Sequence, residues 1–384
     1  MIEFDLEDVK QKIAPQSRIK VLGIGGGGGN MVNSMIESGF ENVSFIVANT
    51  DAQALKISKA NHKVQLGVKS TRGLGAGANP EVGRKSAEED LDLIIDNLKD
   101  SDIVFLTAGL GGGTGSGALP VIAKALRDKD ILTVAVVTKP FSFEGKRRMR
   151  IAQESLDLLK KEVDTIIVLQ NQKLIDTMEP NVSLIQAFSK ANEVLSQFIR
   201  AISDIINKHG QINVDFADIK SIMKQKGFAL IGIGHASGID RAIKAATQAI
   251  SSPLLENVEL SRAKGLLFNI TGPSDLGLHE LSQAASLVYK KAHDDANIVV
   301  GSVIDDNLNE EVFVTVIATG FSDAETENTL DTLNKSSNKI EHEFSKNFDY
   351  SFDNNTSKKP DIKIDLEDLD IPTVMRKVIK ESQF

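Results

Sequence analysis

A glycine-rich segment near the start of the chain is the first feature whose residue types could do chemistry. Residues Gly23–Asn30 contain five consecutive glycines, satisfy the pattern Gly-x-Gly-x-x-Gly and lead into a helical pattern. Glycine lets the backbone approach phosphate oxygens closely, and a helix N-terminus offers them N–H groups. Five glycines in a row carry an entropic cost that a plain turn need not bear. The segment therefore predicts phosphate binding.

Two further glycine-rich segments favour a chain of phosphates over a single pyrophosphate. Gly109–Gly117 follows another apolar run, and Gly73–Pro80 also precedes a helical pattern. Several backbone turns that converge on one place suit a polyphosphate. The P-loop pattern, Gly-x-x-x-x-Gly-Lys-Ser/Thr, does not occur in the sequence. Negative charge would then be offset by backbone N–H groups, the hydroxyls of Thr114 and Ser116, and Mg²⁺ held mainly by phosphates and water.

The elements that must position these segments follow an alternating order. Short β-branched runs alternate with amphipathic ones, which predicts an α/β fold with a Rossmann-like parallel sheet and helices on both faces. The expected strands are 18–24, 43–48, 103–108, 131–137 and 165–169, with helices over 86–98 and 119–126 between them. A long helix is expected over 184–207, followed by strands over 229–233, 266–271, 298–304 and 312–319 in a second, smaller α+β domain.

The pattern divides the chain into six parts. They are an N-terminal extension (1–16), a nucleotide-binding domain (17–183), a central helix (184–207), a C-terminal domain (208–320), a flexible linker (321–366) and a short tail (367–384). The linker is expected because this stretch is rich in Asp, Glu, Asn, Ser and Lys. In the tail, Ile371, Val374, Met375, Val378 and Ile379 share one helix face.

Composition narrows the classes of function. The 384 residues have a net charge of -9, which disfavours nucleic-acid binding through phosphate neutralisation. No cysteine is present, so disulfides and thiolate chemistry are excluded. The acidic start lacks the apolar run of a signal peptide, and no stretch has the length of a membrane span. We expect a protein of the cytoplasm.

The glycine-rich motifs resemble those of the tubulin/FtsZ family. Gly111–Gly117 reads Gly-Gly-Gly-Thr-Gly-Ser-Gly, which is similar to the family signature. Five further segments resemble the family in order and spacing, namely Gly25–Asn30, Asn49–Leu55, Gly73–Gly83, Thr138–Gly145 and Asn213–Asp218. The resemblance covers about residues 17–320, and its length and its tail motif Asp370-Ile371-Pro372 favour the bacterial cell-division branch.

The resemblance implies a GTP site and the residues that form it. Guanine would stack on Phe188 and hydrogen-bond to Asn171 and Asn192, while Glu144 and Arg148 would contact ribose and phosphate. Phe188 and Asn192 are four residues apart, so both can face one pocket. The residues expected to bind phosphate are Gly26, Gly27, Gly28, Asn30, Gly77, Ala78, Gly111, Gly112, Gly113, Thr114, Gly115 and Ser116.

The resemblance also implies that the catalytic group comes from a neighbouring subunit. Hydrolysis needs a residue that positions water, and the glycine-rich segments carry no suitable carboxylate. In the family, the segment containing Asn213, Asp215 and Asp218 inserts into the site of the next subunit. The implied protein is an assembly-dependent GTPase that polymerises with itself at the mid-cell division site. Its 367–384 tail would bind adaptor or membrane-tethering proteins.

Other readings stay open at this level. One is a NAD-dependent oxidoreductase built on the first glycine-rich segment alone, and another is a polymer that binds nucleotide without turnover. The sequence also departs from the family pattern at Gln170, Gln172, Pro273 and Thr373–Met375.

Overall fold

The computed structural model describes residues 18–321, except 177, 179–180, 209–211, 213, 226, 253–254 and 256–259. The chain divides into two units, Met1–Asp331 and Thr332–Phe384, and all described residues belong to the first. The expected N-terminal extension and 367–384 tail lie outside the described residues, as does the expected linker apart from its first residue, Phe321.

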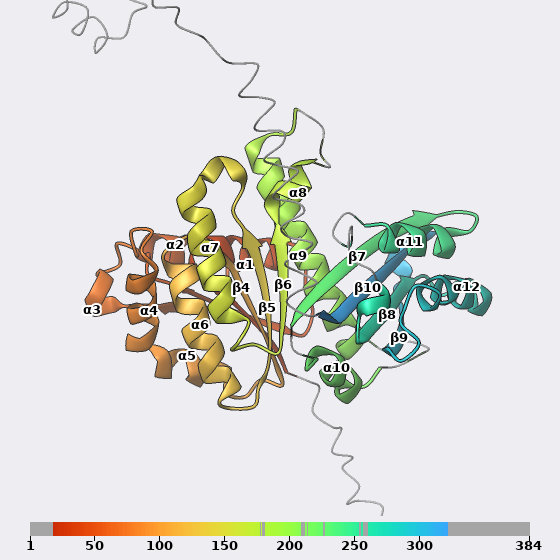
Figure 1. Cartoon of the computed structure of the whole chain (residues 1–384), viewed down its shortest axis with the longest axis horizontal. Helices are drawn as coiled ribbons and strands as arrows, with labels where there is room; N and C mark the ends of the chain where they lie inside the picture. Colours follow the sequence, from red (N-terminus) through yellow and green to blue (C-terminus); the bar gives the residue numbers. More distant parts are fainter. Residues whose placement is uncertain are drawn as a thin grey trace, which may run out of the picture. The chain divides into compact units, whose positions relative to one another are not determined.

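One ten-stranded sheet organises the described residues (Figure 1). Its spatial order is β3-β2-β1-β4-β5-β6-β7-β10-β8-β9. The strands are β1 (Ile19–Ile24), β2 (Val43–Asn49), β3 (His62–Gln65), β4 (Ile103–Gly109), β5 (Leu132–Lys139), β6 (Thr165–Gln170), β7 (Phe228–Ser237), β8 (Gly265–Gly272), β9 (Asn297–Ile304) and β10 (Glu311–Phe321).

Helices occupy most of the connections. The α-helices are α1 (Gly25–Glu37), α2 (Ala52–Ile57), α3 (Val68–Thr71), α4 (Pro80–Glu89), α5 (Leu91–Leu98), α6 (Thr114–Arg127), α7 (Lys146–Leu159), α8 (Asn171–Asp176), α9 (Leu184–Asn207), α10 (Phe216–Met223), α11 (Arg241–Ile250) and α12 (Leu278–Tyr289). Three 3₁₀ turns are η1 (Ser142–Glu144), η2 (Leu260–Arg262) and η3 (Asp306–Leu308).

The first half of the sheet is parallel and covered on both faces, as expected. Strands β1 to β6 pair in parallel, and their alternate residues point to opposite faces. One core is formed by Phe105 and Val134 with residues of α1 and α9, including Phe198. The opposite core joins Leu106 and Val137 to residues of α5, α6 and α7. Burial on both faces explains why these strands read as nearly continuous apolar runs.

The second half of the sheet is mixed. Strand β10 lies antiparallel between β7 and β8, and β9 pairs in parallel with β8. Helices α11 and α12 cover one face of this part with a core of small and branched residues. The two halves meet where β6 and β7 pair through only Ile166↔Phe228 and Ile167↔Ala229. Helix α9 crosses this junction (Figure 1).

Two expected helices have different bounds in the structure. The helix expected over 86–98 belongs to two helices, because the helical conformation is interrupted at Asp90, between α4 and α5. The Asp90 carboxylate instead accepts a hydrogen bond from the Gly67 N–H, at 2.6 Å. The helix expected over 119–126 begins five residues earlier, at Thr114, inside the glycine-rich segment. Expected and observed bounds agree for the long helix Leu184–Asn207.

Candidate nucleotide-binding site

The first turns of α1 and α6 lie against each other at the carboxyl ends of β1 and β4. A Cβ atom on Gly25 would stand 3.0 Å from the backbone nitrogen of Gly115, and Gly25 has a φ of +70°. A Cβ atom on Gly27 would stand 2.9 Å from the nitrogen of Gly109. Only glycine allows this approach. Two helix N-termini, each with N–H groups that lack intrahelical acceptors, therefore open at one place.

The glycines of α1 have two different roles. Gly26 and Gly27 are exposed, and a Cβ atom on Gly26 would meet nothing within 4 Å. Gly28 is buried, and a Cβ atom there would stand 2.4 Å from the backbone oxygen of Thr107. Gly28 thus allows the helix to pack on β4, whereas Gly26 leaves open space in front of the helix. Asn30 is exposed one turn further on.

The second segment forms a tight turn that its own serine shapes. Gly111 has a φ of +98°, and its N–H donates to the Ser116 hydroxyl at 2.8 Å. Ser116 is only 3% exposed, so its hydroxyl shapes the turn from the buried side. A Cβ atom on Gly112 would meet nothing within 4 Å, and Gly112 is partly exposed. Of the residues predicted here, Gly112 and Thr114 are therefore the ones with accessible surface.

The third segment packs on the second. A Cβ atom on Gly113 would stand 2.8 Å from both the Cβ of Ala76 and the backbone nitrogen of Asn79. Gly77 and Ala78 are exposed, with φ values of +57° and +55°. Alanine rarely adopts this left-handed conformation, which is strained for a residue with a Cβ atom. The three glycine-rich segments thus converge, as the sequence predicts.

Thr50 links these segments, although sequence reasoning did not select it. Its hydroxyl lies 2.6 Å from that of Thr114, and its backbone oxygen accepts the Gly75 N–H at 3.2 Å. Thr50 is fully buried. The available signal was its place between an apolar strand and the acidic N-cap of the next helix, Asp51.

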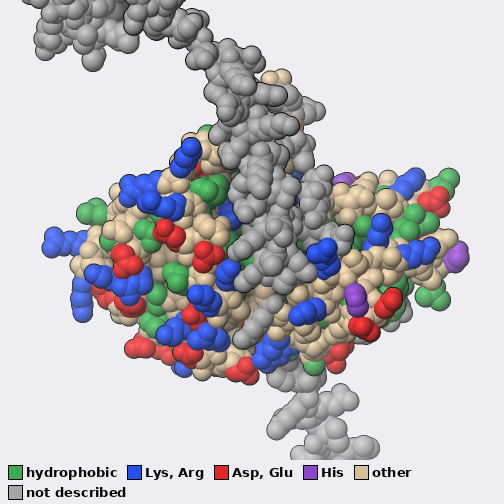
Figure 2. All heavy atoms as spheres, in the orientation of Figure 1, with side chains coloured by type: hydrophobic (Ala, Val, Ile, Leu, Met, Phe, Trp, Pro, Cys, Tyr) green, Lys and Arg blue, Asp and Glu red, His purple; other side chains and the backbone are tan. Residues whose placement is uncertain are grey.

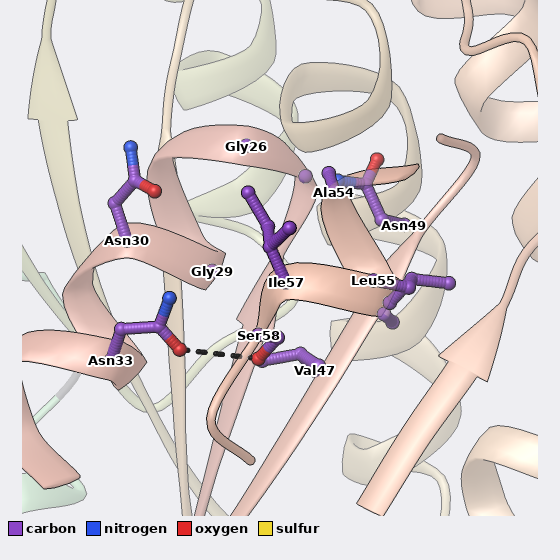
Figure 3. A pocket seen from close by; sticks show the side chains of 12 residues that line it. Gly26, Gly29, Asn30, Asn33, Val47, Asn49, Ala54, Leu55, Ile57 and Ser58 are labelled. Atoms are coloured by element: carbon purple, nitrogen blue, oxygen red, sulfur yellow. Dashed lines mark hydrogen bonds between the residues drawn. The ribbon is translucent and has the colours of Figure 1, made fainter. Parts of the chain in front are cut away.

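A pocket open to solvent lies between α1 and α2 (Figure 3). Gly26, Gly29 and Asn30 line one side, and Asn49 lies among the residues opposite. Asn33 also lines the pocket, and its Oδ1 accepts a hydrogen bond from the Ser58 hydroxyl, with the two oxygens 3.2 Å apart. Amide groups and open helical N–H groups thus border the same space, which is suited to a polar ligand.

The residues expected to bind guanine lie at the start of α8 and along the first half of α9. Asn171 is 4% exposed, and its Oδ1 has no hydrogen-bond partner among the described residues. A buried amide oxygen without a partner is costly unless a ligand supplies a donor. Phe188 is 40% exposed and contacts Phe141 edge to face, with ring centroids 5.0 Å apart. Asn192 is partly exposed one turn along α9.

Glu144 and Arg148 pair with each other at the rim. Glu144 Oε2 accepts from an Arg148 guanidinium nitrogen at 2.5 Å, while Glu144 Oε1 accepts the Phe141 N–H at 2.9 Å. Gln172, a departure from the family pattern, accepts the Ser142 N–H at 3.2 Å and so joins α8 to this turn. Figure 2 shows Lys and Arg side chains near the start of α7, where Lys146, Arg147 and Arg148 are exposed.

A buried lysine, Lys139, connects β5 to α7, the helix that carries Arg148. Lys139, the last residue of β5, is 8% exposed and donates from Nζ to Gln153 Oε1 at 2.8 Å. Burial lowers the pKa of Lys139, and the charge of Asp157 opposes that effect.

The predicted catalytic acids lie at the other end of the sheet. Asp215 and Asp218 are exposed at the start of α10, and Asp215 accepts the Asp218 N–H at 2.8 Å as the helix N-cap. Just after α10, Lys224 pairs at 2.9 Å with Asp130, which precedes β5. Strand β5 then runs eight residues, roughly 23 Å, to the glycine-rich end. Asn213 lies outside the described residues.

The separation is too large for α10 to bridge. Its eight residues span about 12 Å, so Asp215 stays on the order of 10 Å from the glycine-rich segments even if the helix points at them. The structure brings the predicted phosphate and base residues to one edge, and it does not bring Asp215 and Asp218 there.

No group of three or more His, Asp or Glu side chains among the described residues could hold a metal ion. No described helix is long and apolar enough to cross a membrane.

Comparisons with known proteins match both halves of the described sheet. Residues 18–179 match the tubulin/FtsZ family GTPase domain, and residues 227–322 match the FtsZ family C-terminal domain. An FtsZ structure from M. jannaschii, an empty dimer, is 43% identical with a TM-score of 0.75, covering 80% of this chain and 89% of that chain. The structure of a point mutant of that protein is also 43% identical, with a TM-score of 0.75, and the match covers 79% of this chain and 91% of that chain.

This chain therefore belongs to the tubulin/FtsZ family of GTPases. The first matched domain is shared by tubulin and FtsZ, and the second is that of the FtsZ family. CetZ2 from Haloferax volcanii, solved as a GTPγS-bound protofilament, is 21% identical with a TM-score of 0.69. The match covers 84% of this chain and 99% of that chain. At that identity the likeness concerns the fold alone. The family assignment removes the oxidoreductase alternative.

Proposed function

We propose that this chain binds and hydrolyses GTP, and that it polymerises head to tail into filaments that form a bacterial cell-division ring. In this proposal, Asp215 and Asp218 of one subunit complete the site of the next. The observation that carries it is the separation just described: the glycine-rich segments open at one edge of the sheet, and the only acids predicted to position water lie at the opposite edge. Head-to-tail contact would join the two edges and continue into an open filament.

The base contacts support guanine as the ligand. Among the described residues, no donor reaches the Asn171 Oδ1. Guanine offers two neighbouring donors, N1–H and the N2 amino group, whereas N1 of adenine is an acceptor. The exposed face of Phe188 offers a surface for stacking. The remaining proposed contacts are Asn192 to the base, Glu144 and Arg148 to ribose and phosphate, and the glycine-rich segments to the phosphates.

The charge balance supports hydrolysis in the assembled state only. A carboxylate placed against a triphosphate is repelled, so a free subunit gains from keeping Asp215 distant. Mg²⁺ would reduce this repulsion. The oxygens proposed to hold Mg²⁺ are mainly those of the phosphates and of water. The ion's chemistry is neutralisation of phosphate charge.

Self-association has support from a relative. FtsZ of M. jannaschii, 43% identical, is described as a dimer. Adaptor binding by the 367–384 tail and a location at mid-cell in the cytoplasm belong to the proposal as well, and they rest on the sequence alone.

The test mixes two inactive variants. Asp215→Asn removes the charge but keeps an oxygen that can cap α10, and Gly112→Leu fills space that is open in the structure. Each variant alone should release phosphate slowly. Mixed in equal amounts they should recover partial GTPase activity, since a Gly112→Leu subunit still presents Asp215 to its neighbour's GTP. Co-sedimentation of both variants is the control.

The outcomes separate the parts of the proposal. A mixture that co-sediments yet stays inactive would show that each site uses its own acids. Wild-type protein that pellets equally with GTP, GDP and ATP would contradict GTP-driven assembly. Assembly without phosphate release would favour the alternative of a polymer that binds nucleotide without turnover.

A further inference from the structure

The hydroxyls of Thr50 and Thr114 lie 2.6 Å apart, and their surroundings differ. Thr50 follows β2 and is fully buried. Thr114 is the first residue of α6 and is partly exposed at the rim of the glycine-rich segments. The separation fits one strong O–H···O hydrogen bond, for which either residue could supply the proton.

The chemistry of a phosphate ligand settles which hydroxyl donates. Each threonine hydroxyl has a single proton, and phosphate oxygens at neutral pH mainly accept. A Thr114 hydroxyl that donates to a phosphate has no proton left for Thr50. The short bond between the two residues can then persist only if Thr50 donates to the Thr114 oxygen.

We propose that Thr50 is a positioning residue for nucleotide binding, which donates its hydroxyl proton to Thr114 and so directs the Thr114 proton toward the phosphates. This inference rests on the proposed nucleotide site. The accepted bond also polarises the Thr114 hydroxyl and strengthens it as a donor, because hydrogen bonds in a chain reinforce one another.

The main chain around Thr50 holds the hydroxyl in place. Its backbone oxygen accepts the Gly75 N–H at 3.2 Å and faces the Thr71 hydroxyl at 3.3 Å. Two residues along, Ala52 donates its N–H to the Gly73 oxygen at 3.1 Å. Thr50, which orients Thr114 in the second glycine-rich segment, is thus held by backbone hydrogen bonds to the third segment.

The first test compares two substitutions at this position. Thr50→Val keeps the shape and removes the hydroxyl, while Thr50→Ser keeps the hydroxyl. We expect Thr50→Val to weaken GTP and GDP binding about tenfold, and Thr50→Ser to change it less than about twofold. Binding is measured by calorimetry, and thermal melting without nucleotide reports folding. If Thr50→Val does not fold, Thr50→Ala provides a second variant without the hydroxyl.

The second test is a double-mutant cycle. Thr114→Val should weaken binding by more than Thr50→Val does, because it removes the group that contacts the ligand. Adding Thr50→Val to Thr114→Val should change the affinity less than about twofold, because Thr50 acts only through Thr114. Additive effects, or unchanged affinity in Thr50→Val, overturn the inference. Wild-type protein that does not bind GTP would instead overturn the proposed function.

Discussion

Gly28 packs directly on the backbone of Thr107, and a Cβ atom at this glycine would stand only 2.4 Å from the Thr107 oxygen. Two residues earlier, a Cβ atom on Gly26 would meet nothing within 4 Å. Neighbouring glycines of one motif therefore serve different purposes. Gly28 lets a helix approach a strand, and Gly26 keeps space clear for a ligand.

Alanine substitutions should separate these purposes. Gly28→Ala should lower the free energy of unfolding by about 1–3 kcal/mol, because the backbone of α1 or β4 must move. Gly26→Ala should leave stability unchanged or raise it by about 0.5–1 kcal/mol, because it replaces glycine in a helix. It should still weaken GTP binding by filling the open space. Denaturant unfolding and GTP titration of both variants measure these effects, and equal destabilisation would contradict the assignment.

Asn171 should determine base preference. Asn171→Ala removes the buried oxygen that has no partner among the described residues, and it should reduce GTP affinity by about 1–3 kcal/mol, because a guanine donor then loses its acceptor. Asn192→Ala should also weaken GTP binding. Competition of labelled GTP with unlabelled GTP or ATP measures the effect. Equal affinity of the wild-type protein for ATP and GTP would contradict the guanine assignment.

Asp215 should combine two roles that substitution can separate. As the N-cap of α10 it accepts the Asp218 N–H, so Asp215→Ala should cost about 0.5–2 kcal/mol of stability. Asp215→Asn should keep most of that stability, and both variants should bind GTP yet lose about 10²–10⁴-fold in hydrolysis rate. If Asp215→Asn hydrolyses GTP at the wild-type rate, the carboxylate has no catalytic role.

Lys139 should make stability depend on pH. Burial lowers the pKa of Lys139 below the unfolded value of 10.5, so folding favours its neutral form. The contribution of Lys139 to the free energy of unfolding therefore increases as the pH rises through the folded pKa toward 10.5. Unfolding of Lys139→Met and wild type should be compared across this range, and the stability of wild type relative to the variant should rise with pH. Lys124→Met, at an exposed lysine of α6, should show no such trend.

The tail should act separately from the GTPase core. The segment 371–384 contains Arg376, Lys377 and Lys380 against a single acid, Glu381, which suits docking of an amphipathic basic helix to a partner. Deleting 367–384 should leave polymerisation and GTPase activity close to wild type but abolish localisation to the division site. Fluorescence microscopy of the truncated protein measures this, and normal localisation would contradict the adaptor role.

The sequence predicted well those elements whose pattern is local. The apolar spacing from Leu184 onward predicted the bounds of α9, and buried β-branched runs placed nine of the ten described strands within a few residues. The short edge strand β3, half of whose residues are exposed, was not predicted. The glycine-rich segments were expected to converge, since carboxyl ends of neighbouring parallel strands meet at one edge. The start of α6 was missed because glycines hide a helical pattern.

Features that depend on distant partners could not be predicted. The break at Asp90 follows from its bond to Gly67, 23 residues away in sequence. Ser116 is expected to bind phosphate, and this stays a prediction; the structure adds that its hydroxyl accepts the Gly111 N–H at the buried side of the turn. The role proposed for Thr50 depends on Thr114, 64 residues later, and no local pattern reveals such a pairing.

The run of glycines at the start of α1 also affects motion. Each helical glycine costs about 0.5–1 kcal/mol relative to alanine, so this turn has little intrinsic tendency to stay folded. Its order comes from neighbours such as Thr107, Gly109 and Gly115, which contact only one side. Amide hydrogens of this turn should therefore exchange with solvent faster than those of the following turns, and a bound nucleotide should slow that exchange.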